Sequence, residues 1–144
     1  MPLDQKKEKR SGHRTQWTAQ FAVASELCKL GYEVSFTMGN RTPLADLMVV
    51  SPDQRRMFLV DVKGLYTKNF WLIKPKQTRD ELFYILVYVP DNDTNQFFVM
   101  TQTDVNSLIQ SERIRLNWKE DEPMLGFNWK LALPYKDAWQ VLPK

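Results

Sequence analysis

Histidine and cysteine, the side chains behind many catalytic and metal sites, are almost absent from this sequence. Its 144 residues include one histidine, His13, and one cysteine, Cys28. One cysteine excludes an internal disulfide framework and a cysteine-based zinc site. One histidine in a polar N-terminal segment argues against Ser-His and Cys-His catalysis. Any metal would therefore have to be held by oxygen ligands.

Long apolar runs are missing too. None approaches the roughly 20 residues of a membrane-spanning helix, and the N-terminus has no signal-peptide core. We therefore expect a soluble, cytoplasmic protein with no membrane partner. The composition is 43% apolar and 26% charged, as in one ordinary domain. The net charge of +3 and the pI of about 9.0 favour anionic partners only weakly.

The polar, mostly basic residues 1–14 are expected to form a flexible N-terminal arm, followed by a single domain over residues 15–144. The arm could contact phosphates or simply solubilise the chain. A helix should then run from Thr15, as N-cap, to Leu30 and end at Gly31. Its predicted buried stripe also takes in Gln20, which should face the sheet. The apolar members of that stripe are Trp17, Phe21, Ala24, Leu27 and Cys28.

Two apolar runs, 45–50 and 57–62, are joined by a polar turn and predict an antiparallel hairpin. If the turn is centred between Asp53 and Gln54, Asp46 falls opposite Asp61. Like charges placed there destabilise the pair, so a cation should compensate them. Lys63 lies two residues beyond Asp61 and therefore shares its face of the strand. Two carboxylates beside an ammonium suit Mg²⁺, which prefers oxygen ligands. The alternative is a group of ordinary strand-end ion pairs.

Further strands are expected at 32–38, 82–89 and 96–100, with a second helix over 103–113. Residues 129–142 should form a strand and a short helical turn. The element order is α-β-β-β-…-β-β-α. This order predicts an α/β fold with a mixed β-sheet core flanked by helices.

A basic, polar stretch follows the hairpin and is interleaved with the aromatic residues Phe70 and Trp71. Such a pattern suits nucleic-acid backbone contacts with stacking on bases, although Trp71 could equally be core and the lysines solvated. Arg41, in the loop before the hairpin, could approach a phosphate near Asp46 or be solvated. The other candidate nucleic-acid contacts are Lys68, Lys74, Lys76, Gln77 and Arg79.

Taken together, the segment A-S-E-L-C-K-L-G-Y-E-V, the segment A-D-L-M-V-V and the segment L-V-D-V-K-G resemble the PD-(D/E)xK nuclease superfamily. The likeness covers about residues 15–100. It is to small domains related to Holliday-junction resolvases and restriction endonucleases, and it implies a restriction-endonuclease-like fold. By this resemblance, Asp46, Asp61 and the carbonyl of Val62 are the metal ligands, and Lys63 activates water and stabilises charge on the phosphate. The implied cofactor is Mg²⁺, for which Mn²⁺ can substitute.

The sequence departs from the family at one position. These relatives usually carry a glutamate in the first helix, about three turns before its terminal glycine, and Gln20 occupies that place. An amide can bind a metal-ligated water or a phosphate but supplies no charge. We therefore expect either a metal-dependent DNA endonuclease, with Gln20 in its catalytic group, or a catalytically degenerate module that binds nucleic acid or a protein. Many nucleases of this kind are homodimers, because cutting two strands takes two sites.

Overall fold

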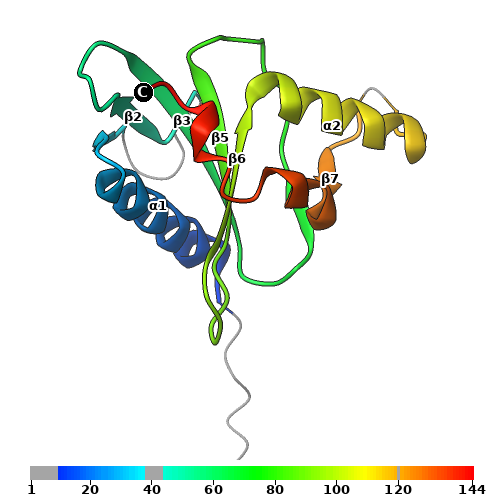
Figure 1. Ribbon diagram of the computed structural model, residues 1–144. Coiled ribbons are helices and arrows are strands. Elements are labelled where there is room, and N and C mark those ends of the chain that lie inside the picture. The colour runs from blue at the N-terminus through cyan, green and yellow to red at the C-terminus, as the bar shows by residue number, and fades with distance from the viewer. Residues whose placement is uncertain (1–9, 38–43, 120) are drawn as a thin grey trace, which may run out of the picture.

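The computed structural model describes residues 10–37, 44–119 and 121–144. Helices pack on both faces of a mixed β-sheet, with α1 on one side and α2 on the other (Figure 1). The predicted α/β fold class is confirmed. The elements in chain order are α1 (Gly12–Lys29), β1 (Glu33–Phe36), β2 (Leu47–Val50), β3 (Met57–Leu65), β4 (Phe70–Leu72), β5 (Leu82–Tyr88), β6 (Gln96–Thr101), α2 (Gln102–Arg115), β7 (Gly126–Asn128) and the 3₁₀ helices η1 (Trp129–Tyr135) and η2 (Trp139–Val141).

The main sheet has the strand order β1-β2-β3-β5-β6, in which β3 and β5 are parallel and the other neighbours are antiparallel. Parallel neighbours need a crossover connection. Residues 66–81 provide it, and they include β4, which pairs with β7 in a separate two-stranded sheet. Trp71 and Ile73 of this connection are buried in the core on the α2 side of the sheet. The connection therefore returns across that face.

The hairpin of β2 and β3 has the register that the turn predicts. Leu47 pairs with Val60 and Met48 with Leu59, where the regular ladder ends. The Asp46 N–H donates to the Val60 carbonyl at 3.0 Å, which keeps Asp46 against β3 beside Asp61. The turn is fixed by Ser51, whose hydroxyl donates to Asp53 and accepts from the Arg56 N–H.

Two hydrophobic cores share the central strand β5. Phe83, Ile85 and Val87 face the core under α1, whereas Leu82, Tyr84 and Leu86 face the core under α2. Alternate side chains of a strand point to opposite faces, so an unbroken apolar run indicates a strand covered on both sides. The β-branched and aromatic content of segment 82–89 predicted a central strand, and β5 lies inside the sheet between β3 and β6.

The buried stripe predicted for α1 is largely wrong. The helix is capped four residues earlier than expected, by Ser11 rather than Thr15. Phe21 is 58% exposed and stacks on Trp17, while Cys28 is also exposed. Gln20 and Leu27 are buried as predicted, and the other buried residues of the helix are Thr15, Ala19 and Val23.

Gly64 of β3 explains this rotation of α1. A Cβ at Gly64 would lie 2.7 Å from the Cβ of Ala19 and 3.1 Å from the Thr15 carbonyl oxygen. The helix therefore approaches the strand through its smallest side chains. Its aromatic residues are too large for that contact and pack instead on each other and on Phe36 of β1.

The C-terminal segment also differs from the prediction. Trp129–Tyr135 and Trp139–Val141 are 3₁₀ helices, and the short strand lies just before them at Gly126–Asn128. A strand was expected from alternating apolar residues, but Pro134 within this segment lacks the N–H that a strand ladder requires. Among the described residues, no helix is long and apolar enough to cross a membrane.

Candidate functional site

Asp46 and Asp61 meet where β2 begins beside the middle of β3. Both side chains are almost completely buried, with Asp46 5% and Asp61 3% exposed. One carboxylate oxygen of Asp46 accepts the Val62 N–H at 2.7 Å, and the other accepts the Gln20 amide at 3.3 Å. The negative charge of Asp61 also acts on Asp46. The sequence-predicted pair is thus brought together on the hairpin.

The surroundings of Asp46 favour its protonated form. Burial first, and then the charge of Asp61, raise the pKa of Asp46 from 3.8 to about 7. The hydrogen bond from the Val62 N–H and the charge of Lys63 act in the opposite direction but are outweighed. A cation would stabilise such a buried pair of carboxylates.

Two lysines approach Asp61. Lys63 Nζ lies 3.6 Å from one carboxylate oxygen, as its position two residues along the strand predicts. Lys76 Nζ lies closer, 2.6 Å from the other oxygen, and it also donates to the Leu44 carbonyl at 3.0 Å. Lys76 comes from the crossover connection, which passes over the face of β3 that carries Asp61. Lys76 was predicted as a nucleic-acid contact, whereas in the structure its ammonium lies beside the carboxylate of Asp61.

Helix α1 supplies two glutamines to the same place. Gln20 is fully buried and turned toward the sheet, as predicted, and its carbonyl oxygen has no hydrogen-bond partner among the described residues. Gln16, one turn earlier, donates to the Val62 carbonyl at 2.7 Å. Sequence reasoning missed Gln16. Its spacing of four from Gln20 places the two amides on one helix face and was the available signal.

Tyr84 of β5 lies beside Asp61, its register partner in the parallel ladder. Its hydroxyl is buried and has no hydrogen-bond partner among the described residues. Burial, followed by the charge of Asp61, raises the pKa of Tyr84, so the phenol stays protonated. A buried phenol is a hydrogen-bond donor that the sequence alone does not single out within an apolar strand.

The oxygen atoms around Asp46 suit a hard cation as ligands. The residues nearest Asp46 supply carboxylate and carbonyl oxygens, and the unpartnered Gln20 oxygen adds one more. The Val62 carbonyl has a second lone pair beyond the one used by Gln16. No group of three or more His, Cys, Asp or Glu side chains placed for a metal exists in the described part of the chain. The charge available to a metal therefore comes from the two aspartates.

The other predicted nucleic-acid contacts are spread over two regions. Lys74, Gln77 and Arg79 are exposed on the crossover connection, beside Lys76. Lys68 lies elsewhere, with Nζ 4.9 Å from the centre of the Trp129 ring and 5.8 Å from that of Tyr88. Tyr88 is four residues beyond Tyr84 on β5, about 13 Å along the strand. Arg41 lies outside the described residues.

Gln102, the first residue of α2, anchors the basic connection and was also missed. Its buried amide accepts the Arg79 N–H at 2.7 Å and donates to the carbonyls of Lys76 and Gln77 at 3.1 and 2.9 Å. These three bonds fix the backbone that presents Lys76 to Asp61. No sequence signal identifies Gln102, because its partners lie more than 20 residues away.

Comparison with known proteins supports the fold. No protein-family model matches the sequence, and no curated protein matches it either. Among solved structures, the chain is similar to the bacterial homing endonuclease I-Ssp6803I, with a TM-score of 0.53. The two are 18% identical, and the match covers 92% of this chain and 91% of that one. The chain therefore has a nuclease-like α/β fold.

Proposed function

We propose that this chain is a metal-dependent nuclease, a DNA endonuclease of the PD-(D/E)xK type. The observation that carries the proposal is the buried pair Asp46 and Asp61 beside Lys63, on adjacent strands of a fold shared with a homing endonuclease. Asp46, Asp61 and the carbonyl of Val62 would hold Mg²⁺ or Mn²⁺. When bound, such a cation polarises the phosphate and lowers the pKa of a coordinated water.

Side chains of the protein would contact the substrate and orient the metal ligands. Lys63 is 35% exposed at its side chain, so it can reach a phosphate while remaining near Asp61. Gln16 and Gln20 orient the Val62 carbonyl and the Asp46 carboxylate through hydrogen bonds. Lys76 neutralises Asp61 in the absence of a cation, and on release it would face the substrate phosphate. The exposed Lys74 and Arg79 would hold the flanking nucleic-acid backbone.

A cleavage assay tests this function. Supercoiled, single-stranded and branched DNA are incubated with Mg²⁺ or Mn²⁺ and with wild-type protein, Lys63→Ala, or the exposed-lysine control Lys130→Ala. We expect metal-dependent nicking that Lys63→Ala abolishes and Lys130→Ala retains. Equal nicking by all three proteins would identify a contaminant and contradict the proposal.

One observation favours a second function, a module on the same fold that binds nucleic acid or a protein without cutting. A neutral amide, Gln20, stands where relatives carry a carboxylate, and the ammonium of Lys76 already compensates Asp61. This reading predicts DNA binding without cleavage by the wild-type protein. Cleavage that appears in Gln20→Glu would then identify the missing carboxylate as the cause.

The remaining properties follow from the nuclease proposal. A duplex has two strands of opposite direction and the described chain has one carboxylate pair, so we propose a homodimer for double-strand cleavage. A cytoplasmic location is proposed because the substrate would be DNA. The predicted boundary between a basic arm at 1–14 and a domain at 15–144 moves toward the N-terminus, because α1 begins at Gly12. We propose that the basic residues before α1 form the arm.

A further inference from the structure

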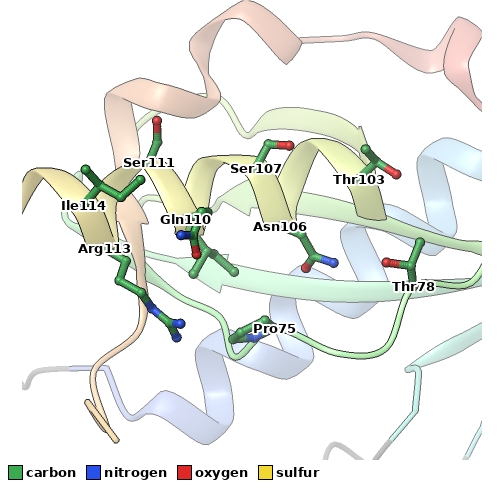
Figure 2. Close-up of a pocket in the computed structure, with 10 residues that line it drawn as sticks. Pro75, Thr78, Thr103, Asn106, Ser107, Gln110, Ser111, Arg113 and Ile114 are labelled. Atoms are coloured by element: carbon green, nitrogen blue, oxygen red, sulfur yellow. The ribbon is translucent and has the colours of Figure 1, made fainter. Parts of the chain in front are cut away.

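A groove of about 600 Å³ lies between α2 and the crossover connection (Figure 2). One wall is the face of α2 from Thr103 to Ile114. The other wall contains Pro75 and Thr78, which flank the residues that bring Lys76 to Asp61. The groove and the carboxylate pair are thus on the two sides of one short segment.

The lining of this groove is uncharged apart from a single positive charge, and it combines polar side chains with the apolar Pro75, Ile109 and Ile114. Thr78, Asn106, Ser107, Gln110 and Ser111 offer hydroxyl and amide groups, and Arg113 supplies the charge. No acidic side chain is among the described residues that line it. Amides and hydroxyls are the groups that hydrogen-bond to base edges, and arginine is the group that pairs with phosphate.

Two lining side chains carry buried atoms that lack hydrogen-bond partners within the described residues. These are Oδ1 of Asn106, an acceptor, and Nε of Arg113, a donor. Both side chains extend from α2 toward the connection, on the side where Pro75 lies (Figure 2). A buried polar group without a partner is costly, so a ligand with both donors and acceptors would be stabilised here.

Asn106 also links the groove to the carboxylate pair. Its amide nitrogen is 3.5 Å from the Lys76 carbonyl, which Gln102 also binds. The residue that contacts Asp61 through its side chain is therefore bound through its backbone by a residue that lines the groove. Lys74 and Arg79 are exposed at the two ends of this segment, and Arg79 pairs with Glu81 at 3.4 Å.

We propose that this groove is a nucleotide-binding subsite, which holds the strand that flanks the phosphate at Asp61. Arg113 binds a phosphate of that strand, and the amides of Asn106 and Gln110 bind base edges. The inference rests on the proposed nuclease function and names where its substrate runs. A nucleic acid fits better than an acidic peptide because the lining pairs one cation with several neutral amides and hydroxyls.

Binding of a short, labelled, random-sequence DNA duplex tests the proposal. The assay is run in EDTA, at several salt concentrations, with wild-type protein, Arg113→Ala, Arg113→Lys and Gln110→Ala. Arg55→Ala, in the exposed hairpin turn, is the matched arginine control. Melting temperatures check that each variant is folded. Gln110 is exposed, so its variant remains informative if Arg113→Ala unfolds.

We expect Arg113→Ala to weaken binding about tenfold and to reduce the salt slope of log K by about 1, which Arg113→Lys restores. Gln110→Ala should weaken binding without changing the slope, because an amide releases no counterion. If Arg113→Ala and Gln110→Ala bind DNA in EDTA as the wild type does, and cleave it as the wild type does in the separate Mg²⁺ assay, the groove proposal is overturned and the nuclease proposal stands. A wild-type protein that neither binds nor cleaves would overturn both. Competition by polyglutamate as strong as by DNA would overturn the assignment to nucleotides.

Discussion

At the scale of single residues, Asp46 links the site to stability. Its pKa of about 7 in the folded protein lies above the ordinary 3.8, so the folded protein binds this proton more tightly than the unfolded chain does. This contribution is therefore fully present below about pH 4 and is lost as the pH rises to about 7. In EDTA, we expect the free energy of unfolding to fall across that window by at most about 1.4 kcal/mol per pH unit.

Denaturant unfolding at a series of pH values measures this loss, and Asp46→Asn is the control. The asparagine cannot titrate but can still accept the Val62 N–H. Its unfolding free energy should therefore vary less over the same window. If the wild type and Asp46→Asn had the same pH dependence, another group would be responsible for it.

Lys76 yields a second residue-scale prediction. Its ammonium lies 2.6 Å from Asp61, and a cation bound to the aspartates would compete with it. In EDTA, we expect Lys76→Ala to lower stability by about 1–3 kcal/mol, since a buried carboxylate loses a charged hydrogen bond. In Mg²⁺, the same variant should gain more in melting temperature than the wild type gains.

Thermal melts with increasing Mg²⁺ compare the two proteins, and Lys74→Ala is the neighbouring control. Lys74 is exposed on the same connection, so its loss should leave both the metal-free stability and the Mg²⁺ response near wild type. A smaller Mg²⁺ response in Lys76→Ala than in the wild type would show that Lys76 supports metal binding instead of competing with it.

The residues of the site differ in how far the sequence could identify them. Asp46, Asp61 and Lys63 were predictable, because strand period and turn position fix which side chains share a face and which oppose each other. Lys76 was recognised only as one of several basic residues. Its contact with Asp61 depends on the path of a connection that Gln102 holds from a distant helix. Local pattern carries no information on such a path.

At the scale of elements, the approach of α1 to β3 sets the position of both glutamines. We expect Gly64→Ala to destabilise the protein by about 1–3 kcal/mol, because its Cβ would meet Ala19 at 2.7 Å and a backbone oxygen at 3.1 Å. The displaced helix should also weaken the bonds of Gln16 and Gln20, and so reduce cleavage.

Chemical denaturation measures the loss, and Gly12→Ala is the matched control. An added Cβ at Gly12 meets nothing within 4 Å, so that variant should be near neutral. Ala19→Gly combined with Gly64→Ala should recover part of the stability, less the roughly 1 kcal/mol cost of glycine within a helix. Gly64→Ala with wild-type stability would contradict the close packing of α1 on β3.

The same contact explains why the predicted stripe of α1 was wrong. Hydrophobicity alone favoured Trp17 and Phe21 as the buried face, but the sheet accepts small side chains at Gly64. The aromatic residues are accommodated by stacking with Phe36 from the edge strand. Gln20 was nevertheless placed correctly, because it belongs to both the predicted stripe and the observed one.

At the scale of the whole molecule, the fold class followed from the order of elements, whereas the pairing of distant segments did not. The central strand pair is parallel, so the chain must cross the sheet between β3 and β5, and it does so on the face that carries Asp61. β4 on this crossover pairs with β7, more than 50 residues later. Short three-residue strands carry too little pattern to predict such a partner.

The described chain carries one carboxylate pair, and under the proposed nuclease function this sets an expectation for the products of cleavage. One centre attacks one phosphodiester per binding event, so supercoiled plasmid should first give nicked circles. In the proposed homodimer, two centres would act on opposite strands and give linear DNA. Adding an excess of Lys63→Ala to wild-type protein should form mixed dimers with one working centre. These should nick DNA without linearising it, so the ratio of linear to nicked product should fall.

The quantity that this experiment measures is the ratio of linear to nicked product, not the total cleavage. Inactive protein also competes for DNA and would lower both products together, whereas mixed dimers lower the linear product selectively. An equal excess of a DNA-binding protein unrelated to this chain supplies the control for competition alone. If excess Lys63→Ala leaves the ratio of linear to nicked product unchanged, the chain cuts both strands as a monomer, by binding twice.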